Sequence, residues 1–376
     1  MKIAMIGHKR IPSREGGVEI VVEELASRMA ACGQDVTVYN RGGHHVAGKE
    51  NDKRYKEKTY KGIHMVTIPT FNKKSLNAIV YAILATIHAV CGRFDVIHYH
   101  AEGSCALLWL PHLLGIRTVA TIHGLDWQRA KWGGFATKFL LFGEKTAAKY
   151  ADEIIVLSQN VQQYFWETYH RQTRFIPNGI TIPELKTANR IQKQYGLHTN
   201  AYLLFLARIV PEKGLHYLIE AYRSLDTDMP LVIAGGSSHS DDYMDRIRKL
   251  AAEDKRIIMT GFVQGQLLEE LYSNCYLYIL PSDVEGMPIS LLEAISYGRM
   301  CLCSDIKENR ETAKEQANYF EHANVNALKD ALQTILQDEE LLLNGNDDIH
   351  IKTRQEFVKV HYDWEKVVKQ TMELYK

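Results

Sequence analysis

Residues 275–298 read CYLYILPSDVEGMPISLLEAISYG and contain a strand pattern, a loop and a helix pattern in that order. The run before Pro281 is apolar and rich in Tyr, Leu and Ile, which is typical of a buried strand. Pro288 suits the first turn of a helix, and Gly298 suits the position just after its end. The stretch therefore predicts a strand-to-helix unit of an α/β fold.

The same alternation extends along the chain in both directions. Helical patterns with apolar residues three and four positions apart separate short apolar runs, which indicates βαβ units and a parallel sheet. The runs fall into two series, residues 2–7, 35–40, 63–69, 95–100, 118–124 and 153–158, then residues 201–209, 230–236, 256–262, 275–281 and 300–304.

The two series are separated by a polar stretch at residues 173–200, TRFIPNGITIPELKTANRIQKQYGLHTN. We therefore predict two facing Rossmann-like, doubly wound α/β domains with a cleft between them, because ligands of such sheets bind beyond the carboxyl ends of the strands. The predicted boundaries are 1–180 for the first domain and 181–355 for the second. Residues 356–376 include an amphipathic helix that we expect to pack back on the first domain.

Composition narrows the class of protein. A chain of 376 residues is long enough for about two domains. Lys and Arg total 45 and Asp and Glu total 45, so net charge indicates no nucleic-acid partner. The six cysteines form no CxxC pair, which suits a reducing cytosol, and no apolar run reaches the roughly 18 residues of a membrane span. MKIAMIG is expected to be a strand and not a signal peptide, so the predicted location is cytoplasmic.

Candidate ligand-binding residues in the first half lie where strands end. Gly16 and Gly17 lead directly into a helix, where free N–H groups can bind an anion, although a flexible loop explains them as well. The dinucleotide fingerprint GxGxxG is absent after the first strand. His123 ends a strand pattern, and a structural role is as compatible with it as a ligand contact. His98 and His100 share one strand face without nearby acids and are interpreted as structural.

Candidates in the second half carry charge. Arg208 and Lys213 lie in one strand-to-helix loop and suit a diphosphate, although a solvated basic loop is the simpler alternative. Gly235 and Gly236 end the next strand and would let the backbone approach a ligand. Asp226-Thr227-Asp228 matches the Asp-x-Asp string of metal-dependent transferases but precedes its strand, so it is interpreted as a turn.

Glu285 and Glu293 lie on either side of the GMP turn of the opening stretch. Glu285 precedes the helix, and Glu293 lies about 7 Å further along its axis at a rise of 1.5 Å per residue. Carboxylates bind sugar hydroxyls well, so the two acids could hold two polyol ends of one extended ligand, with phosphates between them on Arg208 and Lys213.

The order of these motifs resembles a known family. GG at 16–17, HG at 123–124, ARIVPEKG at 207–214 and EGMPISLLEA at 285–294 are similar to the motifs of family 4 retaining glycosyltransferases, which have the two-Rossmann-domain GT-B fold. The N-terminal segment of the chain is also similar to the rhamnosyltransferase-like subgroup of bacterial polysaccharide enzymes. One departure is Gly124, because many members follow the histidine with Asp.

The resemblance implies a role for each matched residue. Glu285, His123, Arg208 and Lys213 would be the catalytic groups, with Glu285 and His123 at the donor sugar and the two cations at the diphosphate. Glu293 would bind the ribose. The remaining donor-binding positions would be Gly16, Gly17, Gly235, Gly236, Phe262, Val263, Gly286, Met287, Pro288 and Ile289.

The implied reaction is a retaining transfer without metal or cofactor, from a nucleotide-diphosphate sugar to a glycan or lipid-linked acceptor in bacterial surface polysaccharide synthesis. A nucleotide-sugar epimerase or a non-catalytic nucleotide-sugar-binding protein on the same fold remains an alternative. Residues 49–74 hold eight Lys or Arg against three Asp or Glu and precede the apolar helix pattern SLNAIVYAILATIHAV. We therefore expect peripheral contact with an anionic inner membrane face, against the simpler alternative of a buried helix beside a solvated loop.

Overall fold

The computed structural model describes residues 1–14, 16–42, 57–70, 74–128, 134–236 and 241–376. The chain forms two compact units, one made of Met1–Gly179 with Trp364–Lys376 and the other of Ile180–Asp363. Each unit is a sheet covered by helices, and each is described by itself.

The first unit is built on an eight-stranded sheet with the order β3-β4-β2-β1-β5-β6-β7-β8, in which only the β3–β4 pair is antiparallel. Its strands are β1 Lys2–Ile6, β2 Asp35–Arg41, β3 Thr59–Tyr60, β4 Ile63–Ile68, β5 Val96–His100, β6 Arg117–Ile122, β7 Glu153–Val156 and β8 Arg174–Phe175. Its helices are α1 Gly17–Ala31, α2 Lys74–Cys91, η3 Glu102–Leu107, α3 Trp109–Leu113, η4 Asp126–Gln128, α4 Gly134–Tyr150, α5 Gln159–Tyr169 and α15 Trp364–Glu373.

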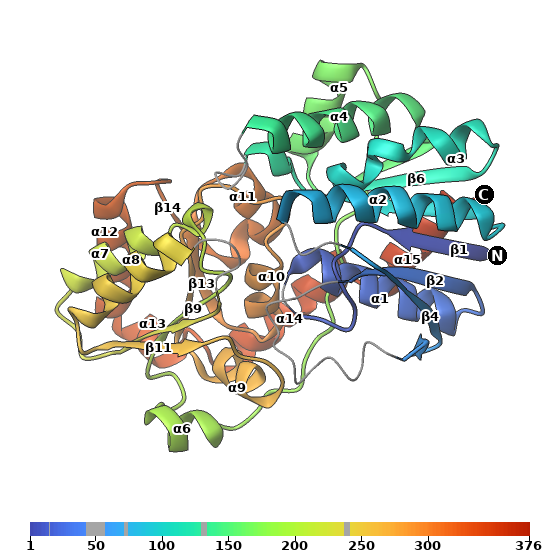
Figure 1. Ribbon diagram of the computed structural model, residues 1–376. Helices are drawn as coiled ribbons and strands as arrows, with labels where there is room; N and C mark the ends of the chain where they lie inside the picture. The colour runs from blue at the N-terminus through green and yellow to red at the C-terminus, as the bar shows by residue number, and fades with distance from the viewer. Residues whose placement is uncertain (15, 43–56, 71–73, 129–133, 237–240) are drawn as a thin grey trace. The chain divides into compact units, whose positions relative to one another are not determined.

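Helices cover both faces of this sheet (Figure 1). Tyr81 and Ala85 of α2 and Phe165 of α5 pack with the alternating apolar residues of β1, β5 and β6 in one core cluster. Helix α15 packs against α1, and the Arg28 guanidinium of α1 lies over the Trp364 ring of α15, 5.7 Å from the ring centroid. The last helix of the chain is therefore part of the first unit.

The second unit is a six-stranded parallel sheet with the order β11-β10-β9-β12-β13-β14. Its strands are β9 Leu203–Leu206, β10 Leu231–Ala234, β11 Ile257–Gly261, β12 Leu277–Leu280, β13 Met300–Ser304 and β14 Asn318–Phe320. Its helices are α6 Arg190–Tyr195, η5 Pro211–Lys213, α7 Leu215–Arg223, α8 Asp241–Ala252, α9 Gln266–Asn274, α10 Ile289–Ser296, α11 Lys307–Ala313, η6 Lys314–Gln316, α12 Val325–Gln337, α13 Glu339–Asn344 and α14 Asp348–His361.

The opening stretch folds as its residue pattern predicts. β12 is fully buried, Pro288 is the N-cap of α10, and Gly298 follows the helix with φ of 73°. The Gly298 N–H donates to Ile295 O and the Arg299 N–H donates to Ala294 O, which is the bond pair of a Schellman motif. A side chain at position 298 would also collide with Ile351 of α14, so glycine is required there twice over.

The second boundary between the units differs from the predicted one. The sequence analysis ended the second domain at 355, whereas α14 continues to His361 and the first unit resumes at Trp364. Val358 is fully buried, and the Tyr362 hydroxyl donates to Thr312 O at 2.8 Å. The burial of Val358 and the hydrogen bond of Tyr362 keep the end of α14 in the second unit.

Candidate functional site

Most of the predicted donor residues of the second unit lie at the carboxyl ends of four adjacent strands. Arg208 and Lys213 follow β9, Gly235–Gly236 follow β10, Phe262 follows β11, and Glu285 follows β12. The strand order reverses direction between β9 and β12. Ligands of open parallel sheets bind at such a switch point, so these loops form the candidate site of this unit.

Backbone contacts hold these loops together. The Ile209 N–H donates to Gly236 O at 3.0 Å, which joins the loop after β9 to the loop after β10. On the other side, a side chain at Gly214 would place its Cβ 1.9 Å from Pro281 O, and Gly214 has φ of 64°. A glycine at 214 therefore lets the β9 loop lie directly against the loop that leads to Glu285.

Lys213 and Glu285 form an ion pair at this junction. The Lys213 Nζ donates to Glu285 Oε1 at 2.5 Å, and the Ser282 hydroxyl donates to the same oxygen at 2.6 Å. The two charged side chains are only 11% and 7% exposed. Buried charges need partners, and here each predicted residue is the partner of the other.

Glu293 lies on α10 and is oriented by a tyrosine. The Tyr272 hydroxyl donates to Glu293 Oε2 at 3.1 Å. The Tyr272 ring stacks on the Tyr297 ring, with the ring centroids 5.2 Å apart. Burial raises the pKa of Tyr272 well above its usual value, and the Glu293 carboxylate raises it further. The phenol therefore stays protonated and acts as a donor to Glu293.

A hollow of about 290 Å³ opens beside these loops. Phe262, which is 44% exposed, lines it, whereas Val263 has a buried side chain and does not. The other residues that line it are Gly235, Gly236, Met244, Asp245, Arg248 and Gly261. Arg248 pairs with Asp245 at 3.2 Å on α8. The hollow is thus bounded by three predicted residues and by residues of α8 that the sequence analysis did not name.

The loop between Glu285 and α10 is well packed. Gly286, Met287 and Pro288 are buried, and Ile289 is half-buried at the first position of the helix. Their main chain therefore has a fixed path between the Lys213–Glu285 pair and Glu293.

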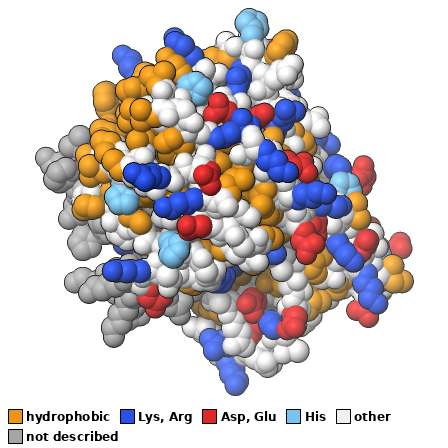
Figure 2. Space-filling view, turned by 90° about the vertical axis from the view of Figure 1, so that its right-hand side faces the viewer, with side chains coloured by type: hydrophobic (Ala, Val, Ile, Leu, Met, Phe, Trp, Pro, Cys, Tyr) orange, Lys and Arg blue, Asp and Glu red, His pale blue; other side chains and the backbone are white. Residues whose placement is uncertain are grey.

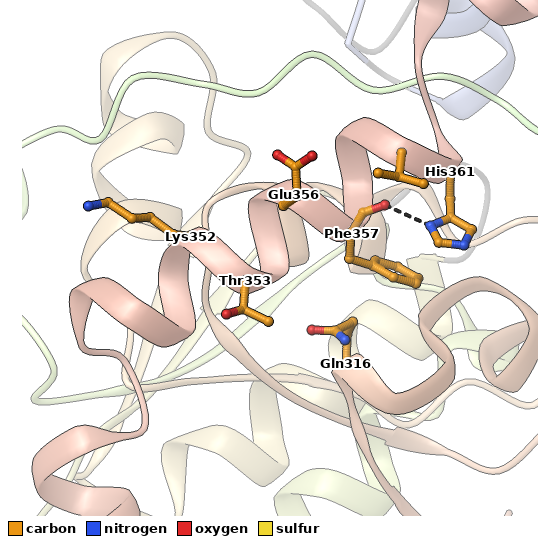
Figure 3. Close-up of a pocket in the computed structure, with 7 residues that line it drawn as sticks. Gln316, Lys352, Thr353, Glu356, Phe357 and His361 are labelled. Atoms are coloured by element: carbon orange, nitrogen blue, oxygen red, sulfur yellow. Dashed lines mark hydrogen bonds between the residues drawn. The ribbon is translucent and has the colours of Figure 1, made fainter.

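A larger hollow of about 500 Å³ lies elsewhere on the second unit and contains none of the predicted residues. Figure 3 shows Lys352, Thr353, Glu356, Phe357 and His361 along α14, with Thr353 and Phe357 on the side of Gln316. The His361 Nδ1 bonds to Phe357 O at 2.9 Å within the helix. This hollow is shaped by one helix face and brings no residues together from separate strand ends.

In the first unit, Gly16 and Gly17 form the start of α1, as predicted, with Gly16 extended at the N-cap. Glu19 in the first turn is buried, and its Oε1 accepts the Lys9 N–H at 2.9 Å. A Cβ at Gly16 would lie 2.4 Å from Glu19 Oε2. Burial alone would raise the pKa of Glu19, but the Lys9 charge and N–H and His8 together lower it below its usual value. An ionised Glu19 therefore ties the loop after β1 to the start of α1.

His123 belongs to a cluster of buried imidazoles at the carboxyl ends of β1, β5 and β6. Its Nε2 lies 3.1 Å from His100 Nδ1, and the His100 ring packs on His98 with centroids 4.2 Å apart. Burial lowers the pKa of His98 to about 3 and of His8 to about 4, and lowers the pKa of His100 well below its usual value. His8, His98 and His100 are therefore neutral at physiological pH.

Two buried acids hold the segment that follows His123. Glu102 accepts the Asp126 N–H at 3.1 Å, and Glu144 accepts the Trp127 Nε1–H at 3.1 Å. Burial raises the pKa of Glu102 to about 11, with Asp126 and Glu144 contributing. Glu102 therefore keeps its proton at neutral pH, and the acids act as an anchor for residues 126–128.

Two further observations concern the described part of the chain. There, no group of three or more His, Cys, Asp and Glu side chains is arranged to hold a metal ion. Among the described helices none combines the length and the apolar character that crossing a bilayer requires.

Comparison with known proteins addresses the family. Residues 15–182 match the family described as Glycosyltransferase Family 4, and residues 188–349 match Glycosyl transferases group 1. Together the two matches extend over nearly the whole chain. The chain belongs to the family 4 glycosyltransferases. It is thus a retaining glycosyltransferase that uses nucleotide sugars.

Individual relatives agree with this family assignment. The chain is 24% identical over 407 residues to the uncharacterized glycosyltransferase MJ1607 of Methanocaldococcus jannaschii, covering 100% of this chain and 98% of the relative. It is 25% identical over 266 residues to the UDP-Gal:alpha-D-GlcNAc-diphosphoundecaprenol alpha-1,3-galactosyltransferase of Escherichia coli, covering 66% and 68%. The structure of sucrose-phosphate synthase from Thermosynechococcus elongatus superposes with a TM-score of 0.83 at 22% identity, covering 100% and 98%. The predicted GT-B fold is therefore confirmed.

Sequence reasoning missed several neighbours of the predicted residues in this glycosyltransferase. His100 was interpreted as structural, yet it contacts His123, and the adjacency of two strand ends in a parallel sheet could have indicated this. Glu19 stands in the first turn after the glycine pair, where an acid is a usual capping signal. Tyr272 and the α8 residues that line the hollow carry no signal in the sequence.

Proposed function

We propose that this glycosyltransferase moves a hexose or deoxyhexose from a nucleotide-diphosphate sugar to a glycan or lipid-linked acceptor in bacterial surface polysaccharide synthesis. The observation that carries the proposal is the Lys213–Glu285 pair at the switch point of the second sheet. Support for the acceptor class comes from the Escherichia coli relative, whose name specifies a diphosphoundecaprenol-linked acceptor. A rhamnosyltransferase-like specificity is also proposed, and it rests on the resemblance of the N-terminal segment of the chain to that subgroup.

The donor nucleotide is proposed to lie along the loops of the second unit. The base would occupy the hollow beside Phe262 and the Gly235–Gly236 backbone, with Val263 contributing through its main chain. Glu293, held by Tyr272, would accept the ribose hydroxyls. Along the carboxyl edge of the sheet, the proposed base site after β10 and β11 is followed by the diphosphate residues after β9 and then by Glu285 after β12.

Charge stabilisation at the diphosphate is the proposed main source of catalysis. As the sugar–phosphate bond stretches, negative charge gathers on the leaving diphosphate and positive charge on the sugar ring. Arg208 and Lys213 would stabilise the diphosphate, and one such preorganised group contributes about 3–4 kcal/mol to lowering a barrier. The Gly286–Ile289 backbone would present its N–H groups to the sugar and phosphate.

Glu285 is proposed to act at the sugar. Its Oε1 is occupied by Lys213 and Ser282, so the carboxylate is held in one orientation. It would accept a sugar hydroxyl and favour the positive charge of the ring. The acceptor hydroxyl would attack from the face that the diphosphate leaves, and the leaving phosphate would take its proton, which gives retention without a covalent intermediate.

The first unit would supply the remaining groups. Gly16 and Gly17 open α1 and are proposed to approach the diphosphate and acceptor with their backbone. His123 is proposed to contact the donor sugar. Its neutral neighbours indicate that it works as a hydrogen-bonding group in an uncharged environment.

Cytoplasmic location with peripheral contact to the inner membrane face is the proposed setting. Ile83, Leu84 and Ile87 of α2 are exposed, while Tyr81 and Ala85 of the same helix are in the core. Figure 2 shows apolar side chains gathered on one region of the surface, with Lys and Arg side chains beside them. Part of the basic segment 49–74 lies outside the described residues. An apolar patch with a basic rim suits an anionic bilayer.

Liposome flotation tests the membrane contact. The wild-type protein should float with anionic liposomes at low salt and less at high salt, because exposed charges are screened. Ile83→Ser with Ile87→Ser should reduce flotation. Leu342→Ser, at a comparably exposed apolar position of α13 in the second unit, is the matched control and should not. Absence of binding at low salt would reject the proposed setting.

Donor screening tests the function itself. A nucleotide sugar present at 100 times its dissociation constant should stabilise the fold by about 2.7 kcal/mol, which a thermal-shift panel detects. The best donor is then incubated with and without glycan and lipid-linked acceptors, and the anomeric configuration of the product is read by NMR. Transfer with retention is the expected result. Epimerisation without acceptor, or binding without turnover on any acceptor, would overturn the proposal.

A further inference from the structure

A line of aromatic rings connects the end of the chain to His123 within the first unit. The Tyr375 hydroxyl lies 2.7 Å from His98 Nδ1, and the Thr121 hydroxyl lies 2.7 Å from His98 Nε2. Both ring nitrogens of His98 are thus bonded. The His100 ring packs on His98, and its Nδ1 lies 3.1 Å from His123 Nε2.

The second nitrogen of His100 decides how the proton between His100 and His123 is placed. His100 is fully buried, and its Nε2 has no hydrogen-bond partner among the described residues. A neutral imidazole carries one N–H. If His100 carries it on Nδ1, that N–H donates to His123 and the unpartnered Nε2 is only a lone pair. If His100 carries it on Nε2, a buried N–H is left without an acceptor.

Buried N–H groups without acceptors are rarer and more costly than under-used acceptors. The first arrangement is therefore favoured, with His100 as the donor through Nδ1. His123 then accepts on Nε2, and as a neutral ring it must carry its own proton on Nδ1.

We propose that His100 is a positioning residue that fixes His123 in the Nδ1–H tautomer, so that His123 acts on its ligand as a hydrogen-bond donor and not as a base. The inference rests on the proposed contact of His123 with the donor sugar. The consequence is chemical: an Nδ1–H group can donate to a sugar or phosphate oxygen but cannot take a proton from the acceptor hydroxyl. This agrees with a transfer in which the leaving phosphate accepts that proton.

The rest of the ring line explains why His100 holds one orientation. Hydrogen bonds to Thr121 of β6 and to Tyr375 fix the His98 ring, and Tyr375 is itself buried. A fixed His98 ring prevents rotation of the ring stacked on it. Burial lowers the pKa of both His98 and His100 far enough that neither ring charges near neutral pH. The donor role of His100 therefore persists over the working pH range.

The tautomer can be read directly in the ligand-free protein. Histidine-ring 15N NMR distinguishes a protonated from an unprotonated nitrogen, and the His123 signals are assigned by their loss in His123→Gln. In the wild type Nδ1 of His123 should be protonated and Nε2 should not. A proton on Nε2 of His123 would overturn the inference. This measurement needs no substrate, so it stands or fails separately from the glycosyltransferase activity.

Two variants of His100 separate positioning from packing. His100→Asn keeps an N–H donor near the Nδ1 position and should retain the wild-type tautomer of His123. His100→Leu keeps an apolar volume but removes the donor, so the proton should spread over both His123 nitrogens. An unchanged tautomer in a folded His100→Leu would contradict the inference, and if that variant does not fold the wild-type and His100→Asn spectra decide.

Kinetics give the second readout. In His100→Leu turnover should fall about tenfold, the effect of one hydrogen bond, while affinity for the nucleoside diphosphate stays unchanged because His123 is proposed to contact the donor sugar, which the free nucleoside diphosphate lacks. His100→Asn should recover most of the rate. Equal losses of rate in both variants, with the same loss of thermal stability, would reduce His100 to a packing residue and overturn the inference.

Discussion

The loops at the carboxyl ends of the two sheets carry different kinds of polar group. Near the switch point of the first sheet lies a cluster of buried imidazoles, in which His100 contacts His123 and His98 contacts two hydroxyls. At the switch point of the second sheet the polar groups are charged, and Lys213 pairs with Glu285. The same strand–loop–helix architecture thus places a hydrogen-bonded imidazole cluster in one unit and a buried ion pair in the other.

This difference agrees with the roles proposed for the two units in the glycosyl transfer. In the proposed reaction negative charge gathers on the leaving diphosphate, and Arg208 and Lys213, which are proposed to stabilise it, lie in the second unit. The sugar ring and the acceptor need orientation more than charge, and the neutral cluster around His123 suits that task. The comparison predicts that the two units respond differently to acid, to charge removal and to loss of a single hydrogen bond.

The largest expected contrast is the response to acid. His8, His98 and His100 have pKa values below the ordinary value of about 6.5, so the unfolded chain binds more protons below that pH. Their stabilisation is present above pH 6.5 and is lost as the pH falls toward 4. At pH 5.5 the loss is about 1.4 kcal/mol for each ring, or about 4 kcal/mol for three.

Hydrogen exchange with mass spectrometry at pH 7.5 and 5.5, corrected for the intrinsic exchange rate, checks this contrast. Peptides from β1 and β5 should lose more protection than peptides from β9 and β10. Equal losses in both units would show that the imidazole cluster does not set the acid sensitivity.

The next effect concerns charge at the second switch point. Lys213→Ala should lower turnover by about 100- to 1,000-fold, because one preorganised group is lost from the developing charge of the leaving diphosphate. It also leaves Glu285 without its cation. The matched control is Lys255→Ala, at an exposed position of the same unit, and it should keep the parent rate. Initial rates with saturating donor measure both, and a Lys213→Ala enzyme of full rate would remove the electrostatic role.

A smaller effect is expected at the ribose position. Glu293→Ala should weaken nucleoside diphosphate binding by about 1.5–3 kcal/mol, the range for hydrogen bonds to a charged group. Tyr272→Phe keeps the carboxylate but removes the donor that orients it, so it should weaken binding less. Isothermal titration calorimetry gives both affinities. The ribose assignment is wrong if Glu293→Ala binds as well as the parent.

The smallest effect is on stability and separates a structural acid from the site acids. Glu270 Oε2 accepts the N–H groups of Asn189, Arg190 and Ile191 and so caps the start of α6. Glu270→Ala should lower the free energy of unfolding by about 1–2 kcal/mol, as for loss of a helix cap. Thermal denaturation measures this, and Glu270→Gln, which keeps an acceptor oxygen, should lose less. A change in kcat without a change in stability would instead place Glu270 in the site.

The fold was largely predictable because its signals are local. Each predicted strand is observed, and Pro288 and Gly298 bound α10 as their backbone preferences require. The short β3, β8 and β14 were missed because two or three residues give no periodic pattern. The end of the second unit was misplaced because α14 is amphipathic with few buried residues.

The site was predictable only where residues stand at strand ends. Arg208, Lys213 and Glu285 belong to loops that the parallel sheet places side by side, so their adjacency follows from topology. The bond from Tyr272 to Glu293 and the contact of Tyr375 with His98 join side chains 21 and 277 positions apart. Such pairs depend on helix packing, which no local pattern encodes.

The central claim is that the second unit binds the diphosphate through Lys213 and the ribose through Glu293. Calorimetric affinities of the nucleoside monophosphate and diphosphate for the parent, Lys213→Ala and Glu293→Ala test it most directly. The parent should bind the diphosphate more tightly than the monophosphate, Lys213→Ala should lose most of that difference, and Glu293→Ala should keep the difference while binding both ligands more weakly. A difference that survives intact in Lys213→Ala would contradict the claim.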